Sequence, residues 1–75
     1  MERYRDRDGD SGVYAYEIGA DFIRVQFEDG GVYLYTYASA GSRNIEHMKN
    51  LARSGDGLNA FITRAVRKGY ERKER

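Results

Sequence analysis

The hydrophobic period of this chain changes once, and that change constrains its fold more than any other feature. Between residues 13 and 37, runs of aromatic and β-branched side chains show period-two features, which are typical of β-strands. After residue 41 the apolar residues recur at intervals of three and four, as they do on one side of an α-helix. The sequence therefore predicts an α+β domain in which the strands come first and the helices follow.

Three strands are predicted in the first half of the chain, over residues 13–18, 22–27 and 32–37. The segments 19–21 and 28–31 separate them, and both contain glycine, which tolerates the positive φ that tight hairpin turns require. We therefore expect a three-stranded antiparallel β-meander.

Two amphipathic helices are predicted in the second half. The first has Ser42 as its N-cap and ends near Ser54 and Gly55, and the second ends at Gly69. Their apolar positions are Ile45, Met48, Leu51, Ala52, Leu58, Phe61, Ile62, Ala65 and Val66. Because each helix has one apolar side, we expect both to pack on one face of the sheet, in the order βββαα.

Both ends of the chain are charged and have no hydrophobic period. Residues 1–11 contain Tyr4 as their one aromatic residue, and residues 71–75 are all charged. Segments of this kind bury too little apolar surface to offset the entropy lost on ordering. We therefore expect a flexible charged tail at 1–11, a charged C-terminal tail at 71–75 and a single domain over residues 12–70.

The composition limits the class of protein. The 75 residues include no cysteine, so neither a disulfide framework nor a cysteine-ligated zinc site is available. The one histidine, His47, is expected on the flank of the first helix without a functional role. No segment has the length and apolarity of a membrane span or the pattern of a signal peptide, so we expect a cytoplasmic protein without a membrane partner. Because titratable residues do not converge in any motif, we predict a non-enzymatic protein with no cofactor and no metal.

Three tyrosines alternate along the third strand and share one face of it; they are Tyr33, Tyr35 and Tyr37. If residues 28–30 form a three-residue loop, Val25 pairs with Tyr33 and the tyrosines enter the core. If residues 29–30 form a two-residue turn, Gln26 pairs with Tyr33 and the tyrosines are exposed, because a slip of one residue reverses every side chain. We favour the three-residue loop, because a type I turn followed by a glycine bulge is a common hairpin connection.

In the favoured register, three apolar residues point to the side of the sheet that no helix covers. They are Phe22, Val32 and Leu34. An open apolar face of this kind marks an interaction surface, so protein binding or self-association, there or at a sheet edge, is one predicted function. The other interpretation is that scattered apolar residues on an open sheet have no partner.

The two signs of charge are distributed unevenly along the chain. Residues 1–37 carry four arginines against eight acidic residues, a net of −4, and residues 38–75 carry nine basic against four acidic residues, a net of +5. The candidate phosphate contacts on the predicted helices are Lys49, Arg53, Arg64, Arg67 and Lys68. Tyr33 and Tyr35 are the candidates for stacking on bases. RNA binding through a basic helical face is our leading prediction, although a solvated helix face would carry the same charges.

The loop before the second helix is a candidate anion site. Gly55, Gly57 and Asn59 lie where the first N–H groups of the helix lack intrahelical partners, and such groups hold phosphates or carboxylates. Asp56 offers the alternative, because its side chain can cap the helix itself and its charge opposes an anion.

The order of these motifs resembles the KTSC domain, a small module named after the C-terminal segment of some lysyl-tRNA synthetases and also found as a stand-alone bacterial protein. Its hallmark is a central Tyr-x-Tyr, which residues 33–35 match as Tyr-Leu-Tyr, and Tyr16 matches an aromatic position further upstream. Residues 52–59 resemble the small-residue and glycine loop of the family. The resemblance covers roughly residues 11–68. It implies a binding module without an established activity, for which RNA is the suggested partner.

Overall fold

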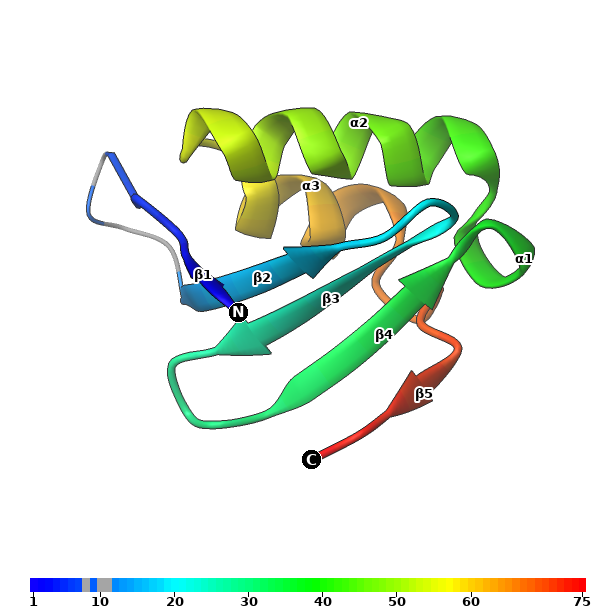
Figure 1. Ribbon diagram of the computed structural model, residues 1–75, viewed down its shortest axis with the longest axis horizontal. Helices are drawn as coiled ribbons and strands as arrows, with labels where there is room; N and C mark the ends of the chain where they lie inside the picture. The colour runs from blue at the N-terminus through cyan, green and yellow to red at the C-terminus, as the bar shows by residue number, and fades with distance from the viewer. Residues whose placement is uncertain (8, 10–11) are drawn as a thin grey trace.

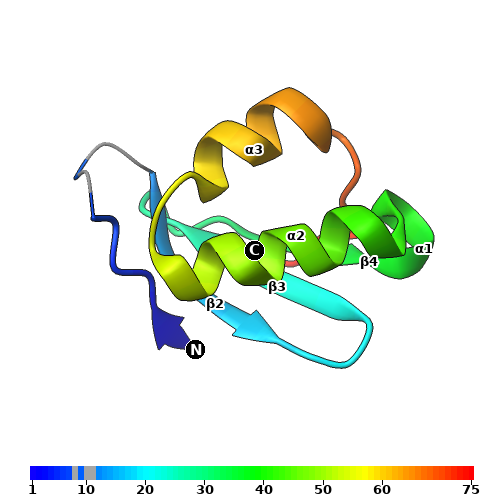
Figure 2. The same cartoon turned by 90° about the horizontal axis from the view of Figure 1, so that it is seen from above.

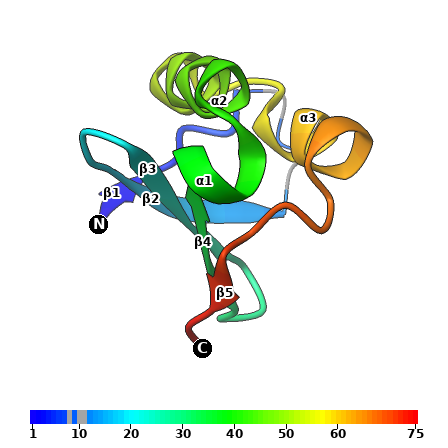
Figure 3. The same cartoon turned by 90° about the vertical axis from the view of Figure 1, so that its right-hand side faces the viewer.

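The computed structural model describes residues 1–7, 9 and 12–75 (Figure 1). Within these residues, five antiparallel strands form one sheet in chain order, and three helices follow the fourth strand. The strands are β1 (Glu2–Arg3), β2 (Val13–Ile18), β3 (Phe22–Phe27), β4 (Val32–Thr36) and β5 (Arg72–Lys73). The helices are α1 (Tyr37–Ala40), α2 (Ser42–Ser54) and α3 (Leu58–Ala65). The α+β class is confirmed, and α2 and α3 lie over the same face of the sheet (Figures 2 and 3).

The hairpin between β3 and β4 has the three-residue loop that we favoured. Gly30 adopts a φ of 95° and its N–H donates to the carbonyl of Phe27 over 2.9 Å. Val25 therefore pairs with Tyr33, and Ile23 pairs with Tyr35. Only 2% of Tyr35 is exposed, so this tyrosine is a core residue and the exposed register is excluded.

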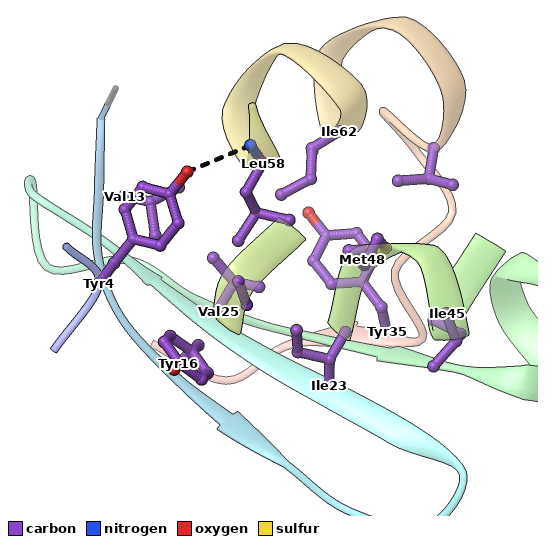
Figure 4. Close-up of a cluster of buried hydrophobic side chains, with 12 residues drawn as sticks. Tyr4, Val13, Tyr16, Ile23, Val25, Tyr35, Ile45, Met48, Leu58 and Ile62 are labelled. Carbon is purple, nitrogen blue, oxygen red and sulfur yellow. Dashed lines mark hydrogen bonds between the residues drawn. The ribbon is translucent and has the colours of Figure 1, made fainter. Parts of the chain in front are cut away.

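The prediction of a flexible N-terminal tail is wrong for the residues of β1 and Tyr4. Glu2 and Arg3 pair with β2, and Tyr4 is buried in the core. The Tyr4 hydroxyl accepts a hydrogen bond from the Leu58 N–H over 3.2 Å (Figure 4). One aromatic ring that fills a core site anchors a segment whose sequence shows no period. Three residues of the predicted tail, Asp8, Asp10 and Ser11, lie outside the described residues.

The prediction of a C-terminal tail is also wrong, because residues 72–73 form β5 beside β4. The Glu71 N–H donates to the carbonyl of Leu34 over 2.6 Å, and the Glu74 N–H donates to the carbonyl of Val32 over 2.7 Å. Without β5, the backbone groups of β4 would lack hydrogen-bond partners at a sheet edge. Pairing with these groups orders residues 71–75 although all five are charged.

The ends of the helices differ from the sequence prediction in three places. The predicted third strand ends one residue early, and Tyr37 is instead the first residue of α1, because Thr36 and Ser39 form a reciprocal capping box. Gly41 rather than Ser42 is the N-cap of α2. Helix α3 ends at Ala65 instead of near Gly69, because Val66 leaves the helical conformation and is buried in the core.

The core lies between the sheet and helices α2 and α3, and Figure 4 shows its side chains converging from all the larger elements. It consists of Tyr4, Val13, Tyr16, Ile23, Val25, Tyr35, Ile45, Met48, Ala52, Leu58, Ile62 and Val66. A groove lies between the β3–β4 hairpin, α3 and the segment that follows α3.

Candidate functional site

The groove between the β3–β4 hairpin and α3 is the candidate site, with a volume of about 580 Å³. Five residues singled out in the sequence line it: Tyr33, Tyr35, Asn59, Arg67 and Lys68. Strand β4 supplies the two tyrosines, α3 supplies Asn59, and the segment after α3 supplies the two basic residues. Residues predicted for stacking, for anion binding and for phosphate contact are therefore neighbours at one site.

Aromatic rings form one wall of this groove. Tyr33 packs edge to face on Phe27, with ring centroids 5.6 Å apart, and on Tyr70, with centroids 4.9 Å apart. The Tyr70 ring also meets Tyr35 at 6.3 Å, at an interplanar angle of 90°. Because Tyr70 is 37% exposed and Tyr33 is half-buried, parts of both rings remain accessible to a planar ligand.

Tyr35 lies deepest among the tyrosines that line the groove, and the prediction that its ring stacks on a base is wrong, because only 2% of the residue is exposed. Figure 4 shows its side chain rising from the sheet towards Ile62 and Met48. Burial, followed by the proximity of Tyr33 and Tyr70, raises the pKa of Tyr35 to about 12. The hydroxyl therefore remains protonated at neutral pH and can both donate and accept a hydrogen bond.

The charges around the groove are divided between its two sides. Arg67 and Lys68 are exposed beyond the end of α3, whereas Glu28 and Asp29 lie in the hairpin loop. One oxygen of Asp29 accepts the N–H of Gly31 over 2.8 Å, which is the turn chemistry that the sequence indicates. An anionic group is therefore favoured at the basic side and opposed at the acidic side.

Lys49 does not contribute to an exposed basic face, and this prediction is wrong. Only 4% of the residue is exposed, and its ammonium donates to Glu46 over 2.7 Å and to the carbonyl of Ala20 over 2.9 Å. Glu46 also accepts the hydroxyl of Tyr37 over 2.6 Å. The bonds from Lys49 and then Tyr37 lower the pKa of Glu46, so the cluster is a closed polar network that ties α2 to the β2–β3 turn.

Arg53 and Arg64 are exposed but do not line the groove. The Arg64 guanidinium lies 6.0 Å from the ring centroid of Phe61, and Phe61 packs on His47 with centroids 4.7 Å apart. His47 therefore packs at the seam between α2 and α3. The five predicted phosphate contacts do not share one helical face.

The predicted anion loop is largely satisfied by its own chain. The N–H of Leu58, at the start of α3, is taken by the Tyr4 hydroxyl, and the N–H of Gly55 donates to the carbonyl of Leu51 over 2.9 Å. Gly57 is the left-handed N-cap of α3 and does not line the groove. Of the three predicted residues, Asn59 alone belongs to the candidate site.

The outer face of the sheet is not the open apolar surface that we predicted. Val32 is 5% exposed and Leu34 is 6% exposed, and only Phe22 is half-buried. Leu34 pairs with Arg24 on one side and with Arg72 on the other, and both arginines bind Glu74. Strand β5 and these ion pairs flank the apolar residues, so the prediction of an exposed face around Val32 and Leu34 is wrong.

Seven of the residues that line the groove were not among the predicted site residues, and they include Phe27, Thr63 and Tyr70. Tyr70 and Phe27 extend the aromatic wall, and Thr63 follows Asn59 by one helical turn. The signal for Thr63 was present in the sequence, because residues four apart share a helical face. The position of Tyr70 depends on β5, which the sequence gives no means to detect.

Within the described ranges, neither a group of metal-ligating side chains nor a helix long and apolar enough to span a membrane is present. Comparison with models of known families, with curated proteins and with solved structures finds no match to this chain.

Proposed function

We propose that this chain is a non-enzymatic binding module that contacts a short single-stranded segment of RNA at the groove. The observation that carries the proposal is that Arg67 and Lys68 line the same groove as the partly exposed rings of Tyr33 and Tyr70. Basic groups beside accessible rings are the combination that single-stranded nucleic acids require, since phosphates bind the cations and bases stack on the rings. The Tyr-x-Tyr motif and its resemblance to the KTSC domain support the same class of module.

The contact is small. Only two of the five predicted basic residues line the groove, and the acidic residues Glu28 and Asp29 oppose a phosphate at the hairpin side. A strand that neutralises two phosphates should show a slope of about −1.4 in a plot of log affinity against log salt. Duplex RNA is disfavoured, because its paired bases cannot stack on the tyrosines.

The test is a fluorescence anisotropy titration of the purified protein with pools of short single-stranded and double-stranded RNA, at low and at moderate salt. Reversing both charges at the groove, with Arg67→Glu and Lys68→Glu, should abolish binding of the single-stranded pool. The matched control reverses two charges away from the groove, with Arg53→Glu and Arg64→Glu, and should retain most of the binding.

Two outcomes would contradict the proposal. Absence of binding at low salt would exclude an RNA contact and would direct the search to protein partners. An equal loss in both double variants would mean that the RNA responds to net charge and not to the groove.

A further inference from the structure

The hydroxyl of Tyr35 is a polar group in a part of the groove where packing alone would favour phenylalanine. The residue is 98% buried, since only 2% of it is exposed, and it lines the groove. Among the described residues, none forms a hydrogen bond with this hydroxyl, yet no buried side-chain oxygen or nitrogen lacks a partner. The hydroxyl is therefore not sealed in the core, and it reaches the groove that Tyr35 lines.

Asn59 adds a second neutral polar group to the same groove. It projects from the first turn of α3, is half-buried, and carries a carbonyl acceptor and an amide donor. Together, Tyr35 and Asn59 present donors and acceptors without charge. Groups of this kind form hydrogen bonds with the polar edge of a base, whereas Arg67 and Lys68 bind a phosphate more strongly.

The dimensions and charges of the groove limit how much of a strand can enter. Its volume of about 580 Å³ lies within the range of sites for small ligands. A second phosphate that extended across the groove would meet Glu28 and Asp29 in the hairpin loop. These two limits favour a single nucleotide within the groove.

We propose that the groove holds one nucleotide and selects its base through the Tyr35 hydroxyl and the Asn59 side chain. This inference rests on the proposed contact with single-stranded RNA and adds a preference for one base to it. In the bound state the base packs against Tyr33 and Tyr70, its polar edge bonds Tyr35 and Asn59, and the phosphate lies at Arg67 and Lys68.

The experiment compares oligoribonucleotides of about eight residues, made only of A, only of C or only of U, a length within the range of single-stranded sites. Wild-type protein should prefer one of them by about 5-fold or more, the difference that one neutral hydrogen bond makes. Tyr35→Phe should weaken the preferred sequence by about 5-fold and leave the other two almost unchanged. The matched control is Tyr37→Phe, which removes a hydroxyl bonded to Glu46 outside the groove and should keep the preference.

Circular dichroism melting establishes that Tyr35→Phe is folded, and Asn59→Ala at the surface of α3 provides a second variant with the same expected loss. Equal binding of the three sequences by wild-type protein would overturn base selection and leave the RNA contact standing. A preference that survives both Tyr35→Phe and Asn59→Ala would also overturn it. Failure to bind any of the three would overturn the RNA contact and base selection together.

Discussion

The buried ammonium of Lys49 ties helix α2 to the turn between β2 and β3. It lies between Glu46 and the carbonyl of Ala20, and it donates a hydrogen bond to each. Helical spacing places a side chain on one side of a helix, but a lysine at the border of the apolar side can point to either environment. The partner that draws Lys49 inward, Ala20, lies 29 residues earlier in the chain.

Replacing the Lys49 ammonium with an apolar end should destabilise the protein. Lys49→Met keeps the packing of the aliphatic stem but leaves the Ala20 carbonyl without its donor, so we expect a loss of about 1–2 kcal/mol in the free energy of unfolding. Urea denaturation measures it. Arg53→Ala, an exposed change on the same helix, should stay within about 0.5 kcal/mol of the wild type. Equal or greater stability of Lys49→Met would show that desolvation of the ammonium cancels its contacts.

At the scale of elements, the sequence predicts those strands and turns that the hydrophobic period and the glycine positions specify. Strands β2 and β3 have the predicted bounds, and the three-residue loop at 28–30 gives the correct register. Strands β1 and β5 have two residues each, which is too short for any period to show. They form because the edges of the sheet need backbone partners and because Tyr4 fills the core, and both causes are tertiary.

The candidate site also combines features that the local sequence encodes with features that depend on tertiary packing. Tyr33, Arg67 and Lys68 were recognisable as residue types suited to RNA, but their convergence depends on where α3 ends and on how α3 packs against the sheet. Arg53 and Arg64 have the same chemistry and lie elsewhere. Residue type was therefore predictable, while the assembly of one site from three segments was not.

The contact between the N-terminal segment and the α2–α3 loop can be tested with two glycines. Gly55 and Gly57 both have left-handed φ, at 76° and 82°. A Cβ added at Gly55 would lie 2.6 Å from the Cβ of Arg5, whereas one at Gly57 would meet only Leu51, at 3.7 Å. We expect Gly57→Ala to cost about 1 kcal/mol through backbone strain and Gly55→Ala to cost at least about 1 kcal/mol more.

Thermal or urea unfolding of the two variants provides this comparison, since the backbone strain is similar in both. Amide hydrogen exchange should locate the additional effect in residues 2–7, which would lose protection in Gly55→Ala and keep it in Gly57→Ala. Equal destabilisation of the two variants would show that the N-terminal segment can move away from residue 55 without a loss in the free energy of unfolding.

At the scale of the whole molecule, burial of Tyr35 links stability to alkaline pH. Its pKa is raised to about 12 in the folded protein, against about 10 in an unfolded chain. Below pH 10 both states keep the proton, and the contribution to stability is fully present. Between about pH 10 and 12 the unfolded chain releases the proton first, so the free energy of unfolding falls as pH rises, by up to about 2–3 kcal/mol.

Urea unfolding at about pH 9 and about pH 11.5 measures this fall. The pKa values of Tyr16 and Tyr37 are also raised, by burial and by the bond to Glu46 respectively, so they contribute in the same direction. Tyr35→Phe isolates the part that belongs to Tyr35, and its stability should fall less between the two pH values. Identical falls in both proteins would mean that Tyr35 ionises equally in the folded and unfolded states.

The two terminal strands, β1 and β5, lie at opposite edges of the sheet, and this arrangement bears on where a tag or fluorophore can be attached. The carbonyl of Arg75 accepts the N–H of Val32 over 3.2 Å, so a fusion at this end would start beside the hairpin that borders the groove. Met1 lies next to β1 at the other edge and is 56% exposed. Neither Met1 nor Arg75 lines the groove, but Arg75 lies beside the hairpin loop at Gly30 and Gly31, so a label on the amino end stays further from that loop than one on the carboxyl end.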